Sequence, residues 1–144
     1  MKNVLIVDSD LQFVCWLCHV LDAAGYETVP ATGIPEAIAA LGELDLSVDL
    51  LMVCPGLPGA RAFANELRSS QRDRLKAIAL IDQNEMQCES AAPWDGWQVK
   101  LSISDAVTRE VFLSLAQSIL ADSAAIAFGG ANVSPRFAVK TSAI

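Results

Sequence analysis

Three residues that can do chemistry each stand directly after a short apolar run. They are Asp8, Cys54 and Lys100, and a fourth run of the same kind ends at Ile81. Such runs are typical of strands that are buried on both faces of a parallel sheet, where sites form at the carboxyl ends of the strands. A carboxylate, a thiol and an ammonium are therefore expected at one edge. We expect Asp8 and Lys100 to form an ion pair that supports the fold or, alternatively, to bind a small ligand.

Two more cysteines form a C-x-x-C pattern at Cys15 and Cys18, with His19 beside them. In redox proteins this motif opens a helix, where the helix dipole lowers the pKa of the thiol. Here the pair is predicted to lie more than one turn inside a helix, which weighs against redox chemistry. Two thiols and one histidine also do not supply the four ligands of a zinc site. We predict neither a metal nor a cofactor.

The elements that position these residues alternate between strand and helix. Apolar runs and turn signals predict strands at residues 4–7, 26–30, 50–53, 77–81 and 97–99, and helices at 11–24, 35–44, 60–70 and 104–122. Residues 83–96 are polar and are interrupted by Pro93 and Gly96, so a helix there would be short or irregular. The alternation predicts an α/β fold with a doubly wound, five-stranded parallel sheet.

The order of these motifs resembles the receiver domain of response regulators in two-component signalling. Three features carry the resemblance, which covers residues 3–121: the opening NVLIVDSD at 3–10, the run DLLMVC with PGLPG at 49–59, and Lys100 after WQV. The resemblance implies a flavodoxin-like fold and a pocket that binds Mg²⁺ and a phosphoryl group. In that family the third strand ends in the aspartate that accepts the phosphoryl group.

Several positions depart from what the resemblance implies. Ser9 stands at the second acid of the magnesium site, Cys54 at the acceptor aspartate, and Ile81 at the hydroxyl that contacts the phosphoryl group. Trp97 takes the position of the aromatic switch residue. A thiol cannot form the acyl phosphate, and it is too soft a ligand for Mg²⁺. We therefore predict a degenerate pocket that is not phosphorylated and does not bind metal.

The predicted first helix has more apolar residues than contact with the sheet requires. The stripe expected to face the sheet consists of Phe13, Trp16, Leu17, Val20, Leu21 and Ala24. The candidates for an outer, interface face are Leu11, Val14, Cys15 and Cys18. Residues 123–144 form an apolar tail that includes Phe128 and Phe137. We expect this tail to cover the outer face, within a subunit or across a homodimer, and a linker to a further output domain is the alternative.

Composition limits the remaining possibilities. The 144 residues fit one domain at 1–122 plus the tail, and the charged fraction of 19 % is below the ~25 % of average soluble domains. A net charge of −7 without a basic cluster argues against a nucleic-acid partner. No apolar run approaches the ~18 residues of a membrane span, and no secretory signal is visible. We expect a cytoplasmic protein with reduced thiols and no membrane partner.

Two functions from different classes follow. The first is a pseudo-receiver, a non-enzymatic module of two-component or phosphorelay signalling that keeps the receiver shape and acts on a protein partner without phosphorylation. The second is a thiol-based redox sensor that uses Cys54 or the Cys15/Cys18 pair. An enzyme is not expected, because no Gly-rich phosphate loop follows the first strand and no Ser-His-Asp set is present. Fold resemblance alone does not establish a reaction.

Overall fold

The computed structural model describes residues 2–44, 47–71, 75–82 and 93–121, and these form five strands and four helices. The strands are β1 (Asn3–Val7), β2 (Glu27–Ala31), β3 (Leu50–Val53), β4 (Lys76–Ile81) and β5 (Gly96–Val99). The helices are α1 (Leu11–Ala23), α2 (Ile34–Leu44), α3 (Ala60–Gln71) and α4 (Ala106–Leu120). A short or irregular helix was predicted within 83–96, and residues 83–92 of that stretch lie outside the described residues, as does the tail at 123–144. None of the described helices is long and apolar enough to cross a membrane.

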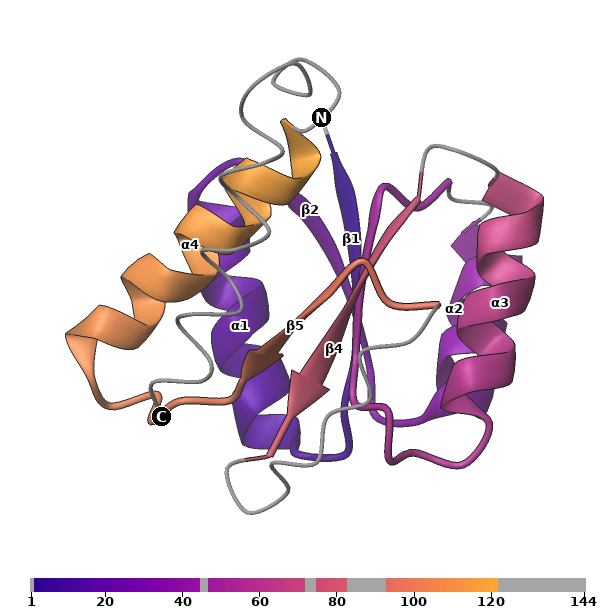
Figure 1. Ribbon diagram of the computed structural model, residues 1–144, viewed down its shortest axis with the longest axis horizontal. Helices are drawn as coiled ribbons and strands as arrows, with labels where there is room; N and C mark the ends of the chain where they lie inside the picture. Colours follow the sequence, from indigo (N-terminus) through magenta and orange to yellow (C-terminus); the bar gives the residue numbers. More distant parts are fainter. Residues whose placement is uncertain (1, 45–46, 72–74, 83–92, 122–144) are drawn as a thin grey trace.

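The strands form one parallel sheet in the order β2-β1-β3-β4-β5. Helices α1 and α4 cover one face of the sheet, and α2 and α3 cover the other (Figure 1). Strand order and helix placement confirm the predicted doubly wound, flavodoxin-like α/β fold. In the register, Val7 of β1 pairs with Val53 of β3, whereas β4 runs two residues further and pairs Ile81 with Val99 of β5.

The pleat of the sheet divides the core into two clusters. Side chains of one parity, such as Leu5 and Val7, pack against α2 and α3, and the alternate ones, such as Val4 and Ile6, pack against α1 and α4. Because both faces are covered, the central strands contain almost only apolar residues, as expected for a parallel sheet. The same alternation decides which side chain at each strand end turns toward α1 and α4.

Helix α1 begins at the predicted residue 11 and ends at Ala23, one residue before the predicted end. The Asp10 carboxylate accepts a hydrogen bond from the amide of Phe13 at 3.2 Å, which caps the first turn. The helix stops before Gly25, whose φ of 100° is readily adopted by glycine. Phe13 and Trp16 contact the ring of Phe112 on α4, with ring centroids 5.6 and 6.0 Å apart. These rings join the two helices on one face of the sheet.

The buried side of α1 is wider than predicted. Val14 was expected on the outer face, but it is fully buried in the cluster shared with α4. The reason is that α4 packs beside α1, so α1 contacts a helix as well as the sheet. Trp16, expected to face the sheet, is only partly buried, and Ala24 is exposed beyond the end of the helix. The outer face predicted for α1 is therefore reduced to Leu11, Cys15 and the half-buried Cys18.

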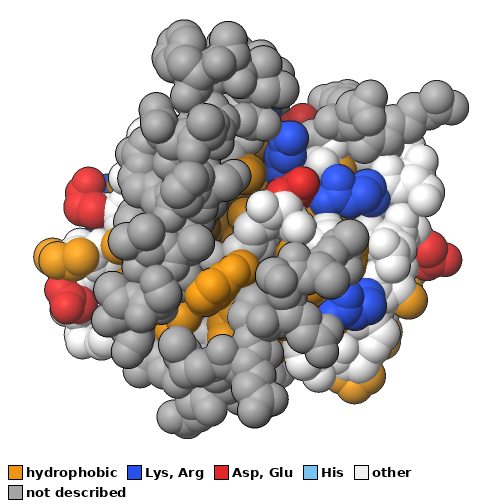
Figure 2. Space-filling view, viewed as in Figure 1, with side chains coloured by type: hydrophobic (Ala, Val, Ile, Leu, Met, Phe, Trp, Pro, Cys, Tyr) orange, Lys and Arg blue, Asp and Glu red, His pale blue; other side chains and the backbone are white. Residues whose placement is uncertain are grey.

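The entry to β5 is held against α3 by charged and aromatic side chains. One guanidinium nitrogen of Arg68 donates to the Asp95 carboxylate at 2.6 Å and to the carbonyl of Pro93 at 2.7 Å. The Asp95 carboxylate also accepts the amide of Ala77 in β4 at 2.7 Å. Ala77 of β4 and Arg68 of α3 thus both bind Asp95 and fix the start of β5. Figure 2 shows acidic and basic side chains next to one another on one face of the molecule, with a group of apolar side chains nearby.

Candidate functional site

The carboxyl ends of four strands place a set of polar side chains at one edge of the sheet. Asp8 follows β1, Cys54 follows β3, Asp82 follows β4 and Lys100 follows β5. Backbone hydrogen bonds extend the ladder to these residues: the Cys54 amide donates to Val7 at 3.0 Å and the Lys100 amide donates to Ile81 at 2.8 Å. The side chains are therefore held by regular backbone, which limits how far they can move.

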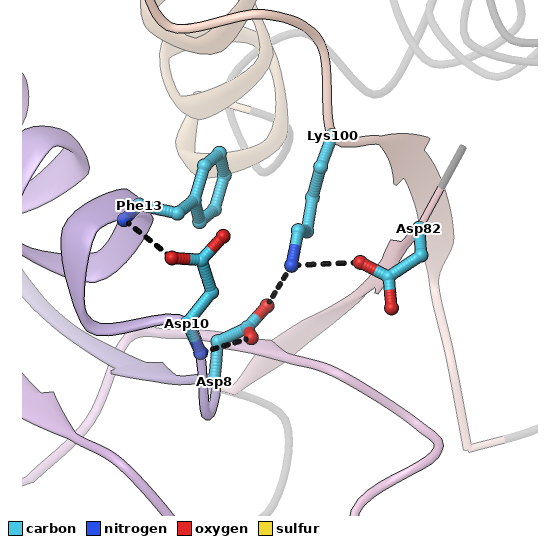
Figure 3. A network of polar contacts seen from close by, with 5 residues as sticks. All are labelled: Asp8, Asp10, Phe13, Asp82 and Lys100. Atoms are coloured by element: carbon cyan, nitrogen blue, oxygen red, sulfur yellow. Dashed lines mark hydrogen bonds and ion pairs between the residues drawn. The ribbon is translucent and has the colours of Figure 1, made fainter. Parts of the chain in front are cut away.

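The Lys100 ammonium lies between two carboxylates (Figure 3). Its Nζ is 3.0 Å from Oδ2 of Asp8 and 2.8 Å from Oδ1 of Asp82. It also lies 5.1 Å from the centre of the Phe13 ring, within range of a cation–π contact. The Asp8 side chain is 2 % exposed, the Lys100 side chain 10 % and the Asp82 side chain 44 %. The predicted Asp8–Lys100 ion pair is present, and Asp82 makes it a triad.

Both oxygens of Asp8 are already bonded within the chain. Oδ1 accepts the amide of Asp10 at 2.9 Å while Oδ2 accepts from Lys100. The Asp10 carboxylate is turned to the first turn of α1, where it caps the Phe13 amide. Ser9 is exposed between them. The first strand-to-helix connection therefore uses its carboxylates for internal hydrogen bonds.

The residues at this edge do not fit the Mg²⁺ ion that the resemblance implies. Mg²⁺ needs near-octahedral oxygen ligands, usually with carboxylates among them. Here Asp8 is bound to an ammonium, Asp10 caps a helix, and Cys54 offers a soft thiol. Among the residues that the structure describes, no three His, Cys, Asp or Glu side chains are placed to hold a metal ion.

The ammonium of Lys100 stays charged at neutral pH. Burial by itself would lower the pKa of Lys100, but the hydrogen bonds that its ammonium donates to Asp82 and Asp8, together with the charges of these carboxylates, outweigh burial and raise the pKa. Two negative charges within contact distance therefore balance the desolvation of the ammonium. The triad is a stable ionic arrangement and is not a proton donor poised near neutrality.

Cys54 is buried at the end of β3, and its environment keeps the thiol protonated. Burial is the main cause that raises the pKa of Cys54, the hydrogen bond from the Gly56 amide lowers it, and the charges of Asp8 and Asp82 raise it. The charge of Lys100 lowers the pKa of Cys54 but does not outweigh burial. Because the thiolate is the reactive form of cysteine, this environment disfavours nucleophilic chemistry.

The side chain that reaches this edge from β4 belongs to Asp82, whereas the sequence analysis assigned the place to Ile81. Ile81 is buried in the core cluster against α2 and α3. The pleat explains the difference, because Ala77, Ala79 and Ile81 share that face and residue 82 turns to the opposite one. The alternation of faces along KAIALID at 76–82 is the signal that distinguishes the two residues.

Solved structures similar to this chain share one architecture. The chemotaxis response regulator CheY4 of Vibrio cholerae is 23% identical, with 83% of this chain and 99% of that chain covered and a TM-score of 0.64. A putative response regulator from Chloroflexus aurantiacus is also 23% identical, with 83% and 98% covered and a TM-score of 0.67. A response regulator receiver domain protein from Clostridium thermocellum is 14% identical, with 81% and 98% covered and a TM-score of 0.59. The chain has the fold of response-regulator receiver domains.

The likeness to these receiver domains lies in the fold, because the sequence identities are low. No protein-family model and no curated protein sequence matches the chain. The receiver fold accounts for why Asp8, Cys54 and Lys100 meet, since each follows a parallel strand at the same edge. It does not account for Asp82, whose contact with Lys100 is a property of this chain's own residues.

The remaining predicted residues of the receiver fold are distributed as follows. Trp97 on β5 is partly buried against the cluster that contains α2 and α3. Of the proposed interface residues, Leu11 is 59% exposed, Cys15 is exposed and Cys18 is half-buried. Phe128 and Phe137 lie outside the described residues. The exposed apolar surface of α1 is therefore real but smaller than the sequence indicates.

Proposed function

We propose that the chain is a pseudo-receiver, a signalling module of two-component or phosphorelay systems that acts through protein–protein contact without being phosphorylated and without catalysing a reaction. The observation that carries the proposal is the state of Lys100. In the receiver family that the sequence resembles, Lys100 matches the lysine that follows the fifth strand. Here its ammonium is bound by Asp8 and Asp82 of the same chain.

Two further observations support the absence of phosphorylation. Cys54 stands at the end of β3, where a carboxylate would be needed to form an acyl phosphate. The Asp82 carboxylate next to Lys100 would also repel an incoming phosphoryl group, because like charges at close range are unfavourable. The pocket therefore lacks an acceptor carboxylate at position 54 and holds the negative charge of Asp82 beside Lys100.

The test is incubation of the protein with acetyl phosphate and Mg²⁺, followed by intact-mass measurement. We expect no gain of a phosphoryl group, while a receiver domain with an acceptor aspartate, treated in parallel, serves as the positive control. A stable gain of one phosphoryl group on the native protein would contradict the proposal. Titration with Mg²⁺ alone, followed by calorimetry, should likewise give no saturable binding below about millimolar, the range of physiological sites.

The thiol-sensor alternative finds little support in the environment of the cysteines. Burial raises the pKa of Cys54 and also that of Cys18, so both thiols are held in the less reactive protonated form. Cys15 and Cys18 lie in the second turn of α1, away from the helix N-terminus that lowers thiol pKa values. Loss of partner binding on mild oxidation, absent in a Cys54→Ser variant, would favour the sensor over the pseudo-receiver.

The partner is proposed to be a protein, with a second copy of this chain as one such partner. The exposed side chain of Leu11 on α1 and the apolar composition of residues 123–144 support an apolar contact. Light scattering of the full chain and of a variant that ends at residue 122 tests the contribution of the tail. We expect the full chain to be dimeric and the shortened one to be monomeric or poorly soluble. The same oligomeric state for the full and the shortened chain would contradict a role of the tail in assembly.

A further inference from the structure

The two carboxylates that contact Lys100 differ in how deeply they are buried. The Asp8 side chain is 2 % exposed and is also bonded by a backbone amide, whereas the Asp82 side chain is 44 % exposed. Figure 3 shows that Asp82 approaches the ammonium from the side opposite Asp8 and α1. The contact between Lys100 and Asp8 is therefore an interior ion pair. The contact between Lys100 and Asp82 lies nearer the surface and joins the ends of the neighbouring strands β4 and β5.

We propose that Asp82 is a built-in anion that occupies the position of an added ligand at Lys100 and holds the ends of β4 and β5 in a single arrangement. Asp82 follows β4 directly, and Lys100 follows β5 directly. The backbone of the same two residues is joined through the hydrogen bond from the Lys100 amide to Ile81 at 2.8 Å. The ends of β4 and β5 are thus joined twice, once by the ion pair between side chains and once by the backbone hydrogen bond.

The placement of Lys100 extends this connection to α1. The Lys100 ammonium lies over the Phe13 ring, and Phe13 is the residue whose amide is capped by Asp10. Movement of the end of β4 away from Lys100 would remove one of two counter-charges from a side chain that is only 10 % exposed. Because a buried charge needs its partners, the arrangement with Asp82 in contact is favoured without any ligand. The inference rests on the proposed function, since a pocket that took up a phosphoryl group would require Lys100 to release Asp82.

The test is amide hydrogen exchange, measured by NMR, on the full chain and on an Asp82→Asn variant, which keeps the shape of the side chain and removes its charge. Partly exposed ion pairs contribute little to stability, and amide exchange reports the local stability of the strand end. Exchange of the Lys100 amide should therefore become only about two- to fivefold faster in the variant. The matched control is Glu110→Gln, which removes one negative charge from an exposed position of α4. Exchange of the Lys100 amide should be unchanged in the control, and Asp82→Glu should restore part of the protection.

A second measurement varies the salt concentration for both the wild-type chain and Asp82→Asn. Salt at 1 M shortens the screening length to about 3 Å and weakens surface ion pairs far more than buried ones. Exchange of the Lys100 amide should therefore rise with salt in the wild-type chain and should be independent of salt in Asp82→Asn. Equal exchange in wild type and Asp82→Asn at low salt, or the same salt dependence in both, would overturn the inference. Neither result bears on phosphorylation, which the acetyl phosphate experiment decides by itself.

Discussion

Replacing Lys100 by methionine should destabilise the protein, because a buried ion pair with Asp8 is lost. Methionine retains an unbranched apolar stem to pack on Phe13 but removes the ammonium between Asp8 and Asp82. The Asp8 carboxylate, 2 % exposed, would then keep only its hydrogen bond from the Asp10 amide. Removing one partner of a buried ion pair costs about 3–5 kcal/mol, and the remaining hydrogen bond places the expected loss near the lower end, about 3 kcal/mol.

Chemical denaturation at pH 7 measures the change in the free energy of unfolding. A thermal melt should show a decrease in Tm of roughly 10 °C, since 1 kcal/mol corresponds to about 2–4 °C for a chain of this size. Arg109→Met, which removes an exposed positive charge from α4, is the control and should stay within about 0.5 kcal/mol of wild type. A double variant with Asp8→Asn should be more stable than Lys100→Met alone, because no uncompensated buried charge remains. A loss below about 1 kcal/mol in Lys100→Met, or no recovery in the double variant, would refute the reasoning.

Three further predictions concern pH, thiols and the entry to β5. The stability difference between wild type and Lys100→Met should be constant from pH 6 to 9 and should shrink only above about pH 10.5. The reason is that the pKa of Lys100 is raised in the folded state. The stabilising contribution of the charged lysine is therefore complete below the pKa of the unfolded state and is lost as the pH rises through the pKa of the folded state. Iodoacetamide should modify exposed Cys15 before buried Cys54, as read by peptide mass mapping, and equal rates would contradict the burial of Cys54. Asp95→Ala should lower the free energy of unfolding by about 1–3 kcal/mol in urea denaturation, because Arg68 and an amide of β4 lose their acceptor, and an unchanged midpoint would show that these contacts are dispensable.

The fold could be predicted from the sequence because its local signals agree with one another. Continuous apolar runs marked strands that are covered on both faces, and the helix predicted at 11–24 is found at Leu11–Ala23. Val14 could not be assigned in the same way. Its burial depends on α4 lying beside α1, and a hydrophobic stripe on one helix does not reveal how wide an arc its neighbours cover.

The candidate site was predictable only in part. Asp8, Cys54 and Lys100 were recognised because each one ends an apolar run. Asp82 was not predicted, because the apolar run of β4 ends at Ile81 and the last apolar residue was taken as the one at the strand end. The pleat decides between Ile81 and Asp82, because only one of two successive residues can face the ammonium.

The triad around Lys100 also has a consequence for substitutions at position 54. An aspartate at position 54 would add a third carboxylate near one ammonium, since Asp8 and Asp82 already act electrostatically on that position. Like charges that share a site oppose ionisation of the newcomer, so Cys54→Asp alone is expected to be unfavourable. The two positions are therefore coupled, and Cys54→Asp should be tolerated better in a chain that already carries Asp82→Asn than in the chain as it stands.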